Sequence, residues 1–222
     1  MQPVVVTYSL PAGSSTSIAA SQGSTSGLLQ LNGTLGTAAL GVLGTVQQRI
    51  TVTSGGNDSA IYFHIIGLNQ AGFTVSEFLA AASTALATSN LDYRTIISIQ
   101  PSASSVAQTL ATTASTVSAG TNQTGDSLWN IVNWHTTPSN ISYGCVLQSG
   151  AATFSIQYTY DDPNNLPSGV AFPQPFNHPV IVNAGSTVDG VSNDPITAWR
   201  LQITGGTGTV RAIGIQSGLA SP

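Results

Sequence analysis

Hydrophobic and polar residues alternate with a period of two along much of this chain, which is the pattern of half-buried β-strands. The alternation is clear at residues 49–53, and residues 61–66 form a second apolar run after the turn sequence SGGND. Glycine, asparagine and aspartate tolerate the backbone angles of tight turns. We therefore predict a β-hairpin here, and a further strand at residues 91–101.

The second half of the chain repeats this pattern with clear turn sequences between the runs. Strands are predicted at residues 140–150, 151–163, 197–206 and 208–218, and the proline-rich segment 163–179 is predicted to be a loop. Short strands at regular spacing are typical of antiparallel β-sandwiches. The predicted fold class is therefore all-β.

Residues 1–46 differ from the rest because they are rich in Ser, Gly, Thr and Ala and contain few large side chains. Such a segment offers little to bury, so we expect an extended N-terminal arm that a neighbouring surface orders. The predicted organisation is an arm at 1–46, a first β-sandwich domain at 47–122 and a second at 123–222.

One segment conflicts with an all-β fold. In residues 74–89, Thr74 precedes Glu77 by three positions, which is the spacing of a helix capping box, and alanines follow. A short helix and a strand both remain open for this segment.

Two of the four arginines lie close together in the last predicted hairpin. RITVTSGG at 49–56 resembles RLQITGGT at 200–207, which suggests two domains built on a similar plan. If 197–218 is a hairpin, Arg200 and Arg211 are diagonal neighbours on one face of the sheet. Two like charges need an anion nearby or open water, and Asp161 and Asp162 are candidates for a latch within the domain. The alternative is a contact with a neighbouring subunit.

Composition changes this picture, because only 5% of the residues are charged and there is no lysine. The formal net charge is −4 at pH 7, so four scattered arginines provide neither a nucleic-acid-binding track nor a surface for anionic lipid. The apolar run 35–46 is too short and too glycine-rich to span a bilayer. A surface with so little charge favours association, so we expect a component of an assembly.

No metal or cofactor site is predicted. His64, His135 and His178 are far apart and lack the spacing of metal ligands. Cys145 lies between apolar residues, which favours a buried thiol over a nucleophile. The sequence DDPNN at 161–165 lacks the acidic spacing of a calcium loop and is better explained by Asx turns.

No catalytic residues are predicted either. Glu77 is the only glutamate, and nothing marks Asp58 or Asp92, its nearest aspartates in the sequence, as a partner for glycoside hydrolysis. Several aromatic residues are candidates for a sugar-binding platform, although packing in the core explains most of them as well. They are Trp129, Trp134, Tyr158, Tyr160 and Trp199.

Three motifs carry a resemblance to a known family: GGNDS at 55–59, QYTYDDP at 157–163 and TAWRLQITGGTG at 197–208. Over residues 25–218 the chain resembles a group of structural proteins from tailed-bacteriophage virions. The sequence ALATSNLDY departs from that group, which more often has a Gly/Pro-rich turn there. The resemblance implies Ig-like or jelly-roll sandwich domains, no catalysis and a location in the virion.

The resemblance leaves three classes of function open. The first is a capsid decoration or cement protein that binds the major capsid protein or other virion proteins as a homo-oligomer, with a trimer as one arrangement. The second is a neck, tail or head-fibre component. The third, from another class, is a tail-associated protein that binds or cleaves glycans. Exposed Trp129 or Trp134 would favour glycan binding, and a groove around Glu77 would favour cleavage.

Overall fold

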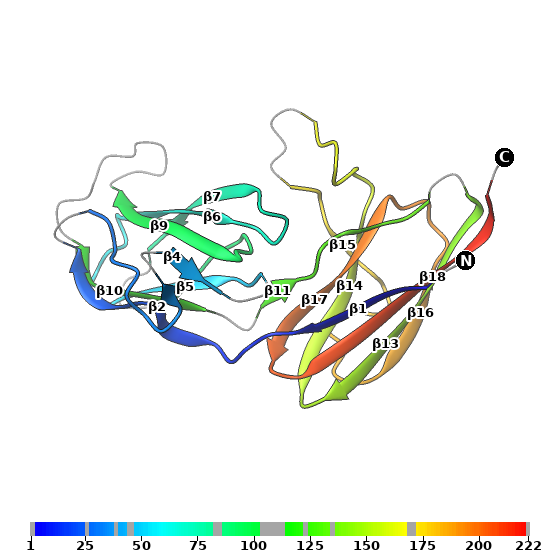
Figure 1. Cartoon of the computed structure of the whole chain (residues 1–222), viewed down its shortest axis with the longest axis horizontal. Coiled ribbons are helices and arrows are strands. Elements are labelled where there is room, and N and C mark those ends of the chain that lie inside the picture. Colours follow the sequence, from blue (N-terminus) through cyan, green and yellow to red (C-terminus); the bar gives the residue numbers. More distant parts are fainter. Residues whose placement is uncertain are drawn as a thin grey trace. The chain divides into compact units, whose positions relative to one another are not determined.

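The computed structural model of the protein describes residues 3–24, 27–37, 40–43, 47–81, 86–102, 114–121, 124–133, 136–167 and 172–220. Within these ranges the chain forms antiparallel β-sheets and no helix, which confirms the predicted all-β fold class. The chain divides into two compact units (Figure 1). Unit N comprises residues 11–125, and unit C comprises residues 1–10 and 126–222.

Unit N contains two sheets. One has the strand order β2 (Ser14–Ser24), β10 (Ala114–Thr121), β5 (Ile50–Ser54) and β8 (Leu86–Thr88). The other has the order β3 (Gly36–Thr37), β4 (Leu40–Val42), β9 (Thr95–Ser102), β6 (Tyr62–Leu68) and β7 (Thr74–Ala80). Fully buried side chains from both sheets form one core, which makes the unit a β-sandwich. They include Ile18, Ile50, Phe63, Ile65 and Ile99.

Unit C also contains two sheets. The first, which we call the β18 sheet, has the order β1 (Val4–Ser9), β18 (Thr209–Ala220), β13 (Thr136–Ser149) and β16 (Val188–Ser192). The second, the β17 sheet, has the order β11 (Gly125–Asp126), β17 (Ala198–Gly206), β14 (Ala152–Thr159) and β15 (Phe176–Asn177), and β12 (Asn130–Ile131) also pairs with β17. The core between them includes Tyr143, Phe154, Ile156, Trp199 and Leu201, all at most 2% exposed.

The two hairpins predicted around glycine turns are wrong. Strand β5 pairs with β8 and β10, whereas β6 pairs with β7 and β9 in the other sheet of unit N. In the same way, β17 pairs with β14 while β18 pairs with β1 and β13. Both glycine turns therefore connect one sheet to the other. Two strands joined by a turn have the same local sequence pattern whether they pair as a hairpin or lie in opposite sheets. Packing across the core decides between the two arrangements.

The similarity between residues 49–56 and 200–207 nevertheless marks equivalent places in the two units. Each segment ends a strand of one sheet and leads through glycines into a strand of the opposite sheet. At the second turn, Gly206 has φ +83°, and a side chain there would come within 2.2 Å of the Ala151 carbonyl oxygen. The glycine is thus required by both backbone angle and space.

The extended arm expected at residues 1–46 is a further difference. Strand β1 pairs with β18 over six residues in unit C, and β2 pairs with β10 in unit N. Leu29 and Leu31 are 5% and 8% exposed in the core of unit N. Backbone pairing does not require large side chains, so a segment with few apolar residues still joins a sheet when those few are buried. The boundary between the units falls at 125/126, three residues after the one expected.

The described part of segment 74–89 is strand. Residues 74–80 form β7 beside β6, and residues 86–88 form β8 beside β5. The Glu77 carboxylate, expected to cap a helix, accepts hydrogen bonds from the backbone amides of Asn90 and Leu91 and from the Tyr93 hydroxyl. Pairing with neighbouring strands outweighs the helix propensity of the alanines.

Candidate interaction surface

Arg200 forms a latch within unit C. Its guanidinium lies 2.8 Å from Oδ2 of Asp126, and the two side chains are 14% and 2% exposed. Nε donates a hydrogen bond of 2.9 Å to Oε1 of Gln157, and Cζ lies 4.5 Å from the centre of the Trp129 ring. The expected type of contact is present, but its acid is Asp126, and neither Asp161 nor Asp162 takes part.

Arg211 lies in the opposite sheet from Arg200, so the two are not the diagonal neighbours expected. It is on β18, where it pairs with Thr7 and Val146. Alternation with the buried Val210 and Ala212 places it on the outer face of the β18 sheet. Among the described residues no acidic side chain forms a salt bridge with Arg211. The Arg211 guanidinium on this face thus has no carboxylate within salt-bridge distance among the described residues.

Asp161 and Asp162 shape the loop that follows β14. Oδ2 of Asp161 accepts a hydrogen bond of 2.7 Å from the backbone amide of Gln174. Oδ1 of Asp162 accepts one of 3.0 Å from the amide of Asn164, which is the Asx turn expected for this sequence. The Thr197 hydroxyl also donates to the Asp161 carbonyl oxygen, so the loop is tied to the start of β17.

Two of the three histidines are built into the units. His64 is 5% exposed on β6 and stacks on Phe78, with ring centres 4.3 Å apart. Nδ1 of His178 accepts hydrogen bonds from the amides of Val180 and Ile181, and burial lowers the pKa of this imidazole. His135 lies outside the described residues. Over the parts of the chain that the structure describes, no group of three or more His, Cys, Asp or Glu side chains is placed to hold a metal ion.

Cys145 and Glu77 have structural surroundings. The Cys145 thiol is fully buried on β13, as expected, and burial raises its pKa to about 12. The Glu77 carboxylate is occupied by the contacts described above. Its nearest aspartates in the sequence have other contacts. Oδ1 of Asp92 lies 3.8 Å from Nε of Arg49, and Asp58 is 4% exposed, with its carbonyl oxygen accepting a hydrogen bond from the amide of Ile61.

The candidate aromatic residues separate into core and surface. Trp199 is 2% exposed in the core, and Trp129 lies against Arg200, while Trp134 is outside the described residues. Tyr158 and Tyr160 join Phe176, which the sequence did not single out, in one cluster with ring centres 5.5–5.9 Å apart. Tyr160 and Phe176 are 47% and 42% exposed, so the cluster presents an aromatic surface to solvent.

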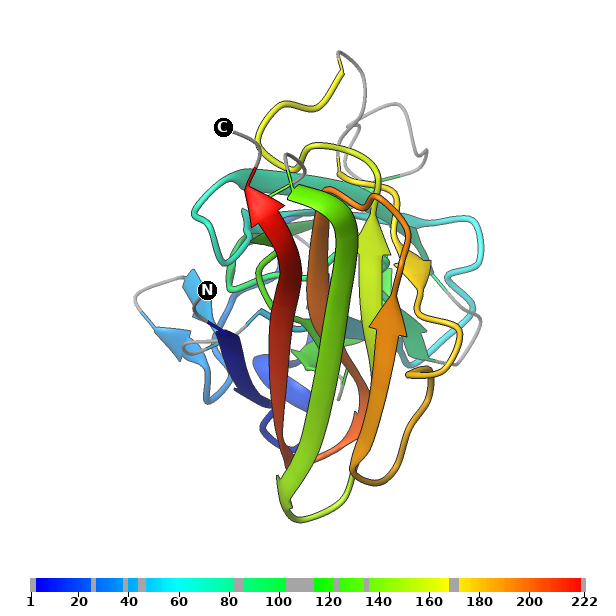
Figure 2. The same ribbon diagram turned by 90° about the vertical axis from the view of Figure 1, so that its right-hand side faces the viewer.

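The outer face of the β18 sheet carries several exposed apolar side chains among polar ones. Val5, Val191 and Ile215 on this face are 53%, 50% and 47% exposed. The strand pairings place Ile213 beside Val5, and Val146 beside Arg211. We call these five apolar residues, Val5, Val146, Val191, Ile213 and Ile215, the Val/Ile face. Figure 2 shows the four strands that carry it side by side, turned toward the viewer.

Sequence reasoning missed the Val/Ile face as a surface. The predicted hairpin puts Arg200 and Arg211 on one face of one sheet, whereas the structure places Arg211 with Ile213 and Ile215 on the outer face of the β18 sheet. The signal was the alternation of Arg211, Ile213 and Ile215, with small or buried residues between them. Val5, Ile213 and Ile215 adjoin on β1 and β18, and Ser142 of β13 lies between Ile215 and Val191. Exposed apolar residues gathered on one face often mark contacts with other molecules.

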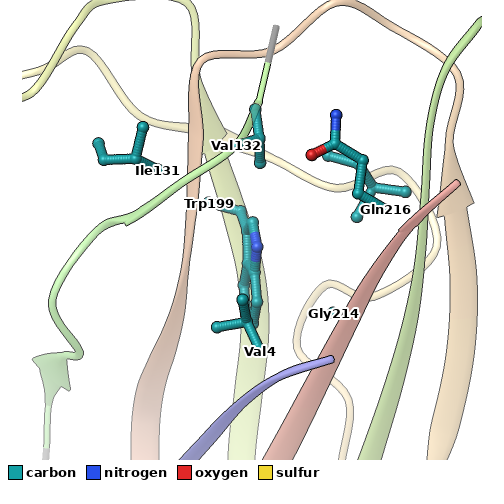
Figure 3. A pocket seen from close by; sticks show the side chains of 7 residues that line it. Val4, Ile131, Val132, Trp199, Gly214 and Gln216 are labelled. Carbon is teal, nitrogen blue, oxygen red and sulfur yellow. The ribbon is translucent and has the colours of Figure 1, made fainter. Parts of the chain in front are cut away.

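One edge of unit C contains a small pocket of about 90 Å³. It opens between Val4 of β1 and Ile131 of β12, which are 39% and 41% exposed. Figure 3 shows the Trp199 ring at its centre, close to Val4. The other lining residues are Val132, Ile141, Gly214 and Gln216.

Comparison with known proteins assigns no family. No protein-family model matches the chain, and no curated protein matches it at a significant level. In the described portion of the chain, no helix has the length and apolar character needed to cross a membrane.

Proposed function

We propose that this chain is a non-enzymatic structural component of a tailed-phage virion, a capsid decoration or cement protein that binds the capsid lattice. The observation that carries the proposal is the Val/Ile face, in which Val5, Val191 and Ile215 are each about half exposed. The motifs GGNDS, QYTYDDP and TAWRLQITGGTG, which resemble those of virion structural proteins, support it.

The chemistry of the Val/Ile face suits contact with another protein. It presents β-branched side chains on a four-stranded sheet, with Arg211, Ser142 and the exposed Asp189 on the same face. Burying such a surface is favourable in proportion to the apolar area removed from water. Binding through it should depend little on salt, since screening acts on charges. A specific contact typically buries about 800 Å² per partner.

Co-sedimentation with empty phage capsids tests the proposal. The unmodified chain should pellet with capsids and saturate, and V191K and I215K should each weaken binding by at least about tenfold, which corresponds to 1.4 kcal/mol. V180K is the matched control, because Val180 is 61% exposed in unit C but lies outside the four strands of the β18 sheet. Circular dichroism would verify that each variant is folded.

Three outcomes would contradict parts of the proposal. Binding to isolated tails or necks in place of capsids would favour the second class of virion component. Binding to none of these particles would refute a structural role in the virion. Equal loss of binding in V180K and V191K would show that the Val/Ile face is not the contact.

The aromatic cluster of Tyr158, Tyr160 and Phe176 favours a second candidate function, which is glycan binding. Exposed aromatic rings can stack on the apolar faces of sugars. A glycan array tests this candidate. Saturable binding that Y160A abolishes would support it, and no bound glycan with the unmodified chain would exclude it.

A further inference from the structure

Strand β1 has one edge that no described strand occupies. It pairs with β18 over six consecutive residues without a bulge, and it is the terminal strand of the β18 sheet. Its sequence, VVVTYS, contains no charge and no proline. Natural edge strands usually carry charges, prolines or bulges that prevent the addition of another strand. The opposite edge strand, β16, carries Asp189, but β1 has none of these features.

The pocket lies beside this edge. Val4 forms one side of its opening and Ile131 the other, so a strand added to β1 would run past the opening. Two polar side chains line it, the Trp199 indole and Gln216. Gln216 is already bonded, since Oε1 accepts from the Asn133 amide at 2.9 Å and Nε2 donates to the Asn133 carbonyl at 2.6 Å. The remaining side chains, those of Val4, Ile131, Val132 and Ile141, are aliphatic and can pack against an apolar side chain.

We propose that a second copy of this chain adds its own β1 antiparallel to β1, which joins two β18 sheets into one across a two-fold axis. Strand addition takes its affinity from main-chain hydrogen bonds and its specificity from pockets for alternate side chains. Each copy offers both parts, because Val4 and Val6 point toward the interior of the sandwich on the side of the pocket. One symmetric contact therefore fills both pockets.

The absence of charge selects a second copy as the partner. Two identical strands usually repel when they carry like charges, but β1 and β12 carry none. A strongly charged partner strand would lose hydration here without gaining a counter-charge. Six residues per copy form a small contact compared with about 800 Å² per partner in a standard interface, so we expect a concentration-dependent dimer. The proposal goes beyond a role in the virion, since the purified chain alone should dimerise.

Disulfide trapping tests the pairing and its register. In a continuous antiparallel sheet with a two-fold axis, the residue at the axis faces itself, so V5C, V6C and T7C together cover the central registers. The native Cys145 is fully buried and does not compete. V191C is the matched control, because Val191 is equally exposed at the opposite edge of the same sheet. A disulfide forms only when the two Cβ atoms lie close together, as they do for the residue that faces itself across the axis. We therefore expect one of the three β1 variants to form covalent dimer at least about tenfold faster than V191C. No excess over V191C at any of them would overturn the proposal.

Sedimentation of charge variants provides a second test that does not depend on cysteine chemistry. V5K should weaken self-association by about tenfold or more, because it places like charges on two adjoining strands. V191K should leave self-association unchanged. If V191K weakens it as much as V5K, the copies meet through their sheet faces, and edge pairing is refuted. Because capsid binding is measured separately, failure of this proposal and failure of the proposed function can be told apart.

Discussion

Replacing Arg200 with methionine should unfold unit C selectively. Methionine keeps much of the apolar length of the side chain but removes the cation that faces Asp126 at 2.8 Å. Asp126 is 2% exposed, so its carboxylate would stay buried without its guanidinium partner. The hydrogen bond to Gln157 and the contact with Trp129 would be lost as well.

The expected loss is large compared with the stability of a domain. Removing one partner of a buried ion pair costs about 3–5 kcal/mol. A single domain has a free energy of unfolding of about 5–15 kcal/mol, so unit C of R200M should be close to its unfolding threshold at 25 °C. The double variant R200M/D126N should recover about 1–3 kcal/mol, because it no longer buries an unpaired charge.

Urea unfolding followed by tryptophan fluorescence measures this loss in one unit. All three tryptophans, at positions 129, 134 and 199, belong to unit C, while circular dichroism reports both units. R49M is the matched control in unit N, where Arg49 lies 3.8 Å from Asp92 and is 30% exposed. This longer, more exposed pair should contribute about 1 kcal/mol or less.

Two results would refute this reasoning. An R200M fluorescence transition within about 0.5 kcal/mol of the unmodified protein would show that the contact is not a latch, since ordinary surface substitutions have effects of that size. If R200M also kept its fold but lost self-association or capsid binding, Arg200 would be a contact with a neighbouring molecule, which is the alternative that the sequence left open.

Two further predictions concern the core of unit C. G214A should destabilise the unit by about 1–3 kcal/mol by overpacking, because a Cβ there would lie 2.5 Å from the Trp199 ring. Gly144 lies on the adjoining strand, and a Cβ there would have no atom within 4 Å. The free energy of unfolding of G144A should therefore stay within about 0.5 kcal/mol of that of the unmodified protein. Equal urea midpoints for G214A and G144A would contradict the packing of Trp199 against Gly214. Because the pKa of His178 is lowered in the folded protein, the unfolded chain binds a proton at this imidazole more readily. The buried neutral ring therefore contributes fully to stability above the ordinary pKa of about 6.5, and this contribution is lost as the pH falls below that value. Imidazole NMR should show His178 titrating below that value, and a midpoint at or above it would rule out the buried neutral ring.

The sequence alone determined the fold class and the chemistry of individual residues. Alternation of apolar and polar residues predicted the strands at 140–150, 151–163, 197–206 and 208–218, which the structure contains as β13, β14, β17 and β18. The apolar neighbours of Cys145 predicted its burial, and DDPNN predicted the Asx turn at Asp162. These properties depend on local backbone preferences and on which side of a strand is apolar, so they are encoded over a few residues.

Only the tertiary structure decided which strands pair and which faces remain exposed. The glycine turns after β5 and β17 cross between sheets, which separates Arg200 from Arg211 and gives Arg200 the partner Asp126. The tertiary structure also leaves Val191 and Ile215 exposed and brings Val4 and Ile131 to one pocket. Residues 4–24 supply strand β1 to unit C and strand β2 to unit N, although this segment contains few apolar residues. Backbone hydrogen bonds are the same for every strand, so the choice of partner depends on how distant side chains fill a shared core, which no local pattern records.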